Sequence, residues 1–189
     1  ADANDITLTG TAITLATVNS GGTAAAGDVT LVATAGAITM NAGGLVTTDV
    51  LTLQATGAVG TSAQRINTAA NTINTQGTNV GGAIFISEAN AVTLGATAFT
   101  TTGGGIDVIS GGAMTATAVT AGGAGSNITL LTTAGDLAVG VLDATGDTAT
   151  LTAAGAITDG DAGNDVTATN LVMTAATGIG AGADALDTT

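Results

Sequence analysis

The segment Leu31-Val32-Ala33-Thr34-Ala35-Gly36-Ala37-Ile38 sets two aliphatic residues, Val32 and Ile38, on either side of five small residues. The same spacing recurs along the chain, at Val32/Ile38, Leu53/Val59, Ile86/Val92, Val108/Met114, Leu131/Leu137, Leu151/Ile157 and Met173/Ile179. The first members of these pairs are 21, 33, 22, 23, 20 and 22 residues apart. Regular self-similarity at such a period is the signature of a solenoid. The longer interval predicts an inserted coil around residues 66–82.

Short alternating segments surround these pairs, such as Ile84-Phe85-Ile86, Ile106-Asp107-Val108 and Ile128-Thr129-Leu130. Alternation of Ile, Val and Leu with other residues indicates half-buried strands, and the glycine pairs between segments suit tight corners. The sequence therefore predicts an all-β right-handed parallel β-helix of about nine coils of about 21 residues. With a strand spacing of about 4.8 Å, the coils would form a rod on the order of 40 Å long. A leucine-rich horseshoe fits less well, because its Asn-containing consensus is missing.

The composition excludes several kinds of chemistry. Among 189 residues, Ala, Thr and Gly account for 40, 40 and 30, and 14 acidic residues face a single cation, Arg65. His and Cys are absent, so a Cys/His zinc site, an imidazole base and a thiol nucleophile are excluded. A net charge of −13 argues against nucleic-acid binding. No apolar stretch is long enough for a membrane span, and we expect the protein not to be an enzyme.

A longer repeat lies over the coil period. Asp5-Ile6-Thr7-Leu8 is similar to Asn127-Ile128-Thr129-Leu130, and Gly27-Asp28 is repeated at Gly146-Asp147, with offsets of 122 and 119 residues. Residues 1–189 are therefore expected to form one solenoid segment with about 1.6 copies of a 120-residue cassette. No polar cap is recognisable at either end, although natural solenoids carry such caps. We therefore expect adjacent repeats, or copies of the same chain, to continue the solenoid end to end.

Residues 31–38, together with 57–60 and 84–95, resemble the β-helix repeats of filamentous-haemagglutinin-type exoproteins, giant repetitive surface proteins of Gram-negative bacteria. The resemblance covers nearly the whole chain at the level of repeat and composition. It implies a β-helix stalk, export through a dedicated outer-membrane partner, and a role in adhesion or cell-surface structure. We accordingly expect a structural segment of an extracellular filament, sheath or giant adhesin.

Three carboxylates in seven residues form a candidate cation site at Asp159, Asp161 and Asp165. Calcium prefers several oxygen ligands, which an Asp-x-Asp loop with glycines supplies. The loop lacks the bidentate Glu of an EF-hand, and an ordinary solvated corner explains the same residues. No other cofactor is predicted.

An interaction surface is predicted for the inserted coil, with Arg65, Ile66, Ile73 and Leu186 as interface residues. In this alternative the protein is an adhesin module, and the inserted coil binds a receptor, a glycan or a neighbouring rod. Rows of threonine, such as Thr115-Ala116-Thr117, also fit a more remote ice-binding function. Their explanation as outward strand residues is simpler.

Overall fold

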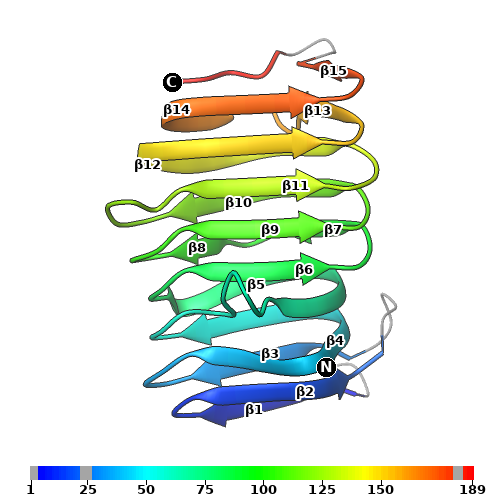
Figure 1. Cartoon of the computed structure of the whole chain (residues 1–189), viewed down its shortest axis with the longest axis vertical. Helices are drawn as coiled ribbons and strands as arrows, with labels where there is room; N and C mark the ends of the chain where they lie inside the picture. Colours follow the sequence, from blue (N-terminus) through cyan, green and yellow to red (C-terminus); the bar gives the residue numbers. More distant parts are fainter. Residues whose placement is uncertain (1–3, 22–26, 181–184) are drawn as a thin grey trace.

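The computed structural model describes residues 4–21, 27–180 and 185–189. Within these ranges the regular secondary structure consists of β-strands alone. All of them pair into one continuous sheet wound around a central axis (Figure 1). The strands are β1 (Ile6–Gly10), β2 (Ile13–Asn19), β3 (Val29–Ala33), β4 (Ile38–Ala55), β5 (Ile66–Val80), β6 (Ile84–Glu88), β7 (Val92–Leu94), β8 (Phe99–Thr101), β9 (Ile106–Ser110), β10 (Met114–Ala121), β11 (Ile128–Thr132), β12 (Leu137–Ala153), β13 (Ala156–Asp159), β14 (Val166–Ala175) and β15 (Gly178–Ile179).

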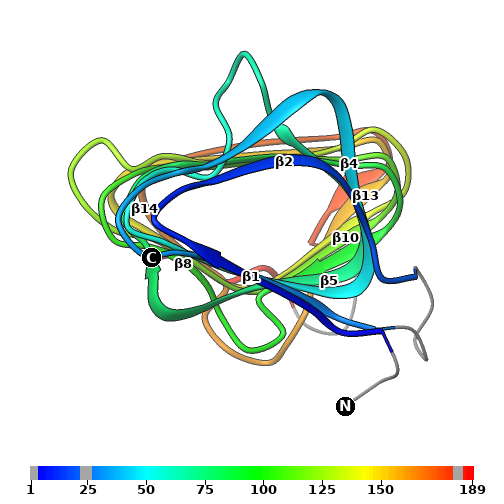
Figure 2. The same ribbon diagram turned by 90° about the horizontal axis from the view of Figure 1, so that it is seen from below.

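The pairing register defines the length of a coil. Ile84 pairs in parallel with Ile106, and Ile106 pairs with Ile128, so equivalent positions are 22 residues apart. The front strands run to the right as the chain climbs in Figure 1, which is a right-handed winding. The predicted right-handed parallel β-helix is confirmed, with about 8 turns of about 22 residues. Seen along the axis, the coils superpose as a rounded triangle from which several loops project (Figure 2).

Alternation along each strand separates the core from the surface. In β6, Ile84 and Ile86 are fully buried whereas Phe85 between them is half-buried on the outside, and β9 and β11 repeat this arrangement. The parallel register stacks these inward residues into aliphatic columns. Ile, Leu and Val fill most of the described inward positions, whereas Ala takes a minority of them, such as Ala116 and Ala149, and buried Thr is rarer still.

Polar residues form one of the inner columns, at Thr68, Glu88, Ser110 and Thr132. This polar column lies where the chain turns a corner, and there the backbone has groups outside the sheet ladder. The Ser110 hydroxyl donates to Asn90 O at 2.7 Å, and the Thr132 hydroxyl donates to Gly135 O at 3.1 Å. Because buried backbone groups require partners, the polar column stabilises the corners.

The recurring aliphatic pair occupies two different faces of the triangle. Leu53 pairs with Leu31 and Thr75, whereas Ile86 pairs with Ile66 and Val108. The 33-residue interval from Leu53 to Ile86 therefore spans about one and a half coils of ordinary length.

The extra length near residues 66–82 is smaller than the sequence intervals predicted. The coil from Val59 to Ile84 has 25 residues, against 21 from Ile38 to Val59. Residues 66–80 belong to β5, which pairs with β4 on one side and with β6 on the other. A short extension replaces the predicted inserted coil.

The alternation turns two members of the recurring aliphatic pairs towards the outside. Leu31 and Leu130 are fully buried, whereas Val32 and Leu131 point outward and are half-buried. In both places two aliphatic residues are adjacent, and the six-residue spacing of the pairs selects the one that points outward. A slip of one residue moves a side chain to the opposite face of a strand.

The 120-residue sequence repeat does not return the chain to the same face. The ladder from Ile38 leads through Val59, Ile84 and Ile106 to Ile128. Its counterpart Ile157 pairs instead with Leu137, nine residues farther along the coil that contains Ile128. An offset of 119 residues corresponds to about five and a half coils of 22 residues.

Candidate functional site

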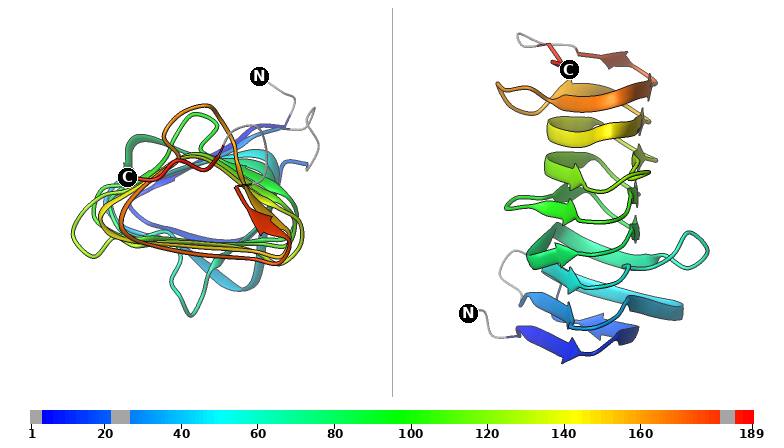
Figure 3. Two further views of the ribbon diagram at one scale, coloured as in Figure 1. Left: turned by 90° about the horizontal axis from the view of Figure 1, so that it is seen from above. Right: turned by 90° about the vertical axis from the view of Figure 1, so that its left-hand side faces the viewer.

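The structure brings the three predicted acidic residues together in one loop. Residues 159–165, called here the acidic loop, connect β13 to β14 and project from the solenoid near its upper end (orange in Figure 3). One carboxylate oxygen from each of Asp159, Asp161 and Asp165 lies within 4.8 Å of the other two. Asp161 is exposed, Asp159 is half-buried and Asp165 is fully buried.

Hydrogen bonds within the acidic loop hold each carboxylate by one oxygen. Asp159 Oδ1 accepts from the Asp161 amide at 2.8 Å, and Asp161 Oδ1 accepts from the Gly163 amide at 2.7 Å. These are Asx turns, which short acidic side chains followed by glycine favour. Asp165 Oδ2 accepts from the Asp187 amide of the next coil at 2.6 Å. The loop is therefore shaped by its own side chains and by Asp187, through Oδ1 of Asp159 and Asp161 and Oδ2 of Asp165.

Asp165 is electrostatically unfavourable as an isolated carboxylate. Its Oδ1 is buried, and it has no hydrogen-bond partner within the described part of the chain. Burial raises the pKa of Asp165 above its ordinary value, and the negative charges of Asp159 and Asp161 raise it further, although the Asp187 amide acts in the opposite direction. A buried carboxylate beside two others needs a proton or a cation for compensation.

The preceding coil makes room for the acidic loop at Gly140. A Cβ at this position would lie 2.9 Å from Asp161 Oδ2 and 2.8 Å from Thr117 O. Any side chain there would displace the Asp161 carboxylate. The loop is thus seated directly against the coil below.

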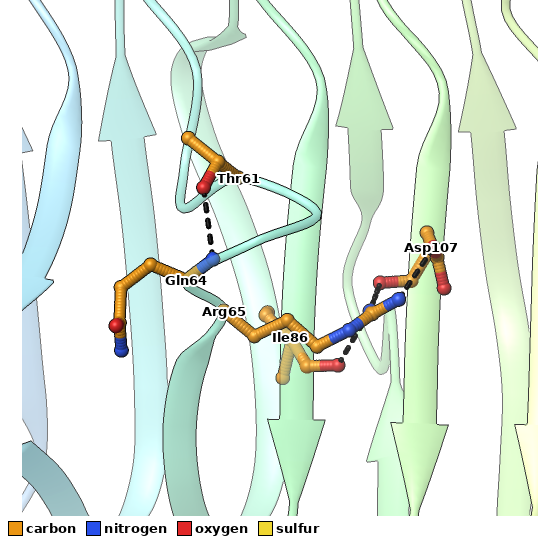
Figure 4. Close-up of polar contacts among 5 residues, drawn as sticks. All are labelled: Thr61, Gln64, Arg65, Ile86 and Asp107. Carbon is orange, nitrogen blue, oxygen red and sulfur yellow. Dashed lines mark hydrogen bonds and ion pairs between the residues drawn. The ribbon is translucent and has the colours of Figure 1, made fainter. Parts of the chain in front are cut away.

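A turn that departs from the regular coil directly precedes Arg65. Gly60 has a φ of +69°, a conformation that glycine adopts without strain. The chain then closes a short turn, in which the Thr61 amide donates to Gln64 O at 2.9 Å and the Gln64 amide donates to Thr61 Oγ1 at 3.0 Å (Figure 4). Arg65 follows at once.

The Arg65 side chain crosses two neighbouring coils. Its Nη1 donates to Ile86 O at 3.2 Å and to Asp107 O at 2.9 Å, and Nη2 forms an ion pair with Asp107 Oδ2 at 2.6 Å (Figure 4). The guanidinium also lies 5.8 Å from the centre of the Phe85 ring. Arg65 therefore joins its own coil to the coils of β6 and β9.

A groove of about 320 Å³ runs beside this contact, over the outer face of β6, β9 and β11. Its lining combines one aromatic ring with small and polar residues, namely Ala83, Phe85, Gly105, Ile106, Asp107, Gly125, Asn127 and Thr129. The groove offers a ligand one ring and a few hydrogen-bonding groups.

The structure does not bring the predicted interface residues together. Ile66 and Ile73 are fully buried in the core, so their assignment to an interface is wrong. The physical reason is strand alternation, which turns both side chains inward. Leu186 is half-buried against the core, and Arg65 is engaged within its own chain.

Threonine ladders on the outside are short. Thr72, Thr93 and Thr115 stack in consecutive coils, and the same row continues with Val50 on one side and Ala138 on the other. Parallel strands favour such cross-strand threonine contacts. The ice-binding function stays a prediction. It calls for an extended array of threonines, which this row does not form.

The first and last complete coils carry inward aliphatic residues that are only half-buried. Ile6 and Leu8 occupy these positions in β1, and Leu171 and Met173 occupy them in β14. Their equivalents within the stack, such as Leu31 and Leu151, are fully buried. Both end faces therefore present the kind of surface that neighbouring coils bury against each other.

Comparisons of the chain with protein-family models, with curated proteins and with solved structures find no match. The likeness to filamentous-haemagglutinin-type exoproteins thus stays a prediction from the residues. No helix in the described ranges is long and apolar enough to cross a membrane. The chain is a repetitive β-solenoid, an architecture that fits a structural repeat module.

Proposed function

We propose that the protein is a non-catalytic structural segment of an extracellular bacterial filament, sheath or giant adhesin, in which further coils continue the solenoid. The aliphatic columns carry this proposal. They run in register through the stack and stay half-buried at β1 and β14. In the described part of the chain, no strand pairs with the outer edge of β1 or of residues 170–175 of β14, and such an edge beside these columns is a template for another coil.

The remaining features suit a load-bearing rod. Hydrogen bonds of a parallel ladder run along the solenoid axis, so every coil is tied to the next by its backbone. Arg65 and the polar column add side-chain links between coils. A net charge of −13 keeps parallel rods apart laterally. The resemblance at residues 31–38 and 84–95 supports the extracellular setting.

Electron microscopy of the purified chain at rising concentration tests the proposal. We expect linear particles that lengthen with concentration by stacking of end faces. Met173→Glu places a charge in the end-face column of β14 and is expected to abolish lengthening. Val172→Glu adds the same charge to the neighbouring outward position, which is 51% exposed, and is expected to leave it intact. Compact monomers at every concentration, or equal effects of the two variants, would refute the proposal.

The groove beside Phe85 favours a second function, a glycan-binding adhesin module. An aromatic ring next to amide and hydroxyl groups is a common lining for small-molecule sites. A glycan array probed with the purified chain distinguishes the two functions. Binding that Phe85→Ala removes, by particles that stay monomeric, would favour the adhesin module.

A further inference from the structure

We propose that the acidic loop binds one calcium ion through Asp159, Asp161 and Asp165. Two observations converge on this site. One oxygen from each carboxylate lies within 4.8 Å of the other two. Asp165 is fully buried, and its Oδ1 has no hydrogen-bond partner in the described ranges.

The protein has no positive charge of its own for this loop. Arg65 is the single Lys or Arg residue of the chain, and its guanidinium is bound to Asp107. Three carboxylates that converge without a counter-charge repel one another, and the repulsion is strongest at the buried member. One proton would neutralise a single carboxylate of the three, whereas a divalent cation from solution would compensate the group as a whole.

The ligand chemistry favours calcium over other cations. All three groups offer oxygen, and the absence of His and Cys removes the ligands that zinc prefers. Calcium binds oxygen at about 2.3–2.6 Å, so two ligands on opposite sides of one ion lie about 4.8 Å apart. Magnesium binds at about 2.0–2.1 Å in a strict octahedron and gives up its water reluctantly, so a loop that offers three carboxylates in no fixed octahedral arrangement suits calcium better. Loop carbonyls and water complete the coordination that calcium demands.

Calcium at this loop would act on coil stacking. Both the backbone and the side chain of Asp165 are hydrogen-bonded to the next coil. Its amide donates to Asp187 O at 3.1 Å, and its carboxylate accepts from the Asp187 amide at 2.6 Å. An ion held by Asp165 would therefore fix the contact between the coil of β14 and the residues that follow it.

Isothermal titration with calcium chloride after chelator treatment, in about 0.15 M salt to screen diffuse attraction, tests the proposal. We expect one calcium ion per chain, with a Kd on the order of 10⁻⁴ to 10⁻³ M, as in extracellular calcium modules. Magnesium is expected to bind more weakly than calcium, with a Kd at least about tenfold higher.

Charge-neutral variants separate a built site from general attraction to an acidic protein. Asp159→Asn and Asp161→Asn are expected to weaken calcium binding about tenfold or more. Asp49→Asn is the matched control, because Asp49 also accepts an exposed hydrogen bond, from Asn71 Nδ2 at 2.8 Å, and lies in β4, several coils from the acidic loop. It removes the same charge and is expected to leave the Kd unchanged within about twofold. Far-ultraviolet circular dichroism checks that each variant keeps the β-helix.

Three results would overturn the proposal. The titration could show no saturable heat, Asp49→Asn could weaken calcium binding as much as Asp161→Asn does, or magnesium could bind as tightly as calcium. Either of the first two results would mean that the acidic loop is an ordinary solvated corner, and the third would mean that the site does not prefer calcium.

Discussion

Glu88 is the residue whose removal should damage the solenoid most for its size. Its side chain is only 2% exposed and accepts three hydrogen bonds. Oε2 accepts from Thr68 Oγ1 at 2.7 Å and from the Ala70 amide at 3.0 Å, and Oε1 accepts from the Asn90 amide at 2.9 Å. Glu88→Ala leaves two backbone amides and one hydroxyl without this acceptor.

The expected loss follows from these contacts. A buried donor left without a partner costs about 1–3 kcal/mol. Removing the carboxylate also relieves its own desolvation, which offsets part of the loss. For two orphaned amides we therefore expect Glu88→Ala to lower the free energy of unfolding by about 3–5 kcal/mol. Glu88→Gln keeps one acceptor oxygen and is expected to cost about half as much.

Urea unfolding followed by far-ultraviolet circular dichroism measures this difference, since the chain has no Trp or Tyr to report by fluorescence. Asp49→Ala is the control, because its carboxylate accepts an exposed hydrogen bond from Asn71 Nδ2 at 2.8 Å. It should change the free energy of unfolding by less than about 1 kcal/mol. If Glu88→Ala costs no more than this control, or if Gln is as harmful as Ala, the account of the polar column is wrong.

Other variants probe the core, the coil-spanning arginine and the acidic loop. Phe99→Ala empties a fully buried position and should cost about 3–5 kcal/mol in the same urea assay. Arg65→Met removes the contacts to Ile86 O and Asp107 while keeping a similar stem, and should cost about 1–2 kcal/mol, with a smaller cost at high salt if the ion pair dominates. Because the folded-state pKa of Asp165 is raised, the folded protein binds this proton more tightly than the unfolded chain, so Asp165 favours folding increasingly as pH falls from neutral towards 3.8. In chelator, the melting temperature of Asp165→Asn relative to wild type should therefore be highest near neutral pH and decline on acidification; a constant difference would contradict this.

The sequence alone was sufficient for the coil, because Ile84, Ile106 and Ile128 repeat at the length of one turn. The direction of winding follows from the general right-handedness of crossovers between parallel strands. The sequence was insufficient for the face on which each motif lies. The spacing of an aliphatic pair around a small-residue corner fits more than one corner of a triangular coil. The interval between Leu53 and Ile86 could therefore be explained equally well by an insertion or by a change of face.

The candidate site shows the same division. Proximity of Asp159, Asp161 and Asp165 follows from their spacing in the sequence. The complete burial of Asp165 depends on how the following coil lies over it, and local spacing carries no information about that. The contact of Arg65 with Asp107 joins residues 42 positions apart, so it could be found only once the register of two successive coils was known.

The mismatch between the 120-residue repeat and the 22-residue coil has a consequence for longer chains of this kind. After each duplication the copied residues emerge on a different side of the rod, because about five and a half windings separate them. A tandem array would display a copied loop in a staggered arrangement, with crowding of like charges reduced along any one side. Lengthening by whole duplications would thereby decorate the fibre around its circumference and not along a single stripe.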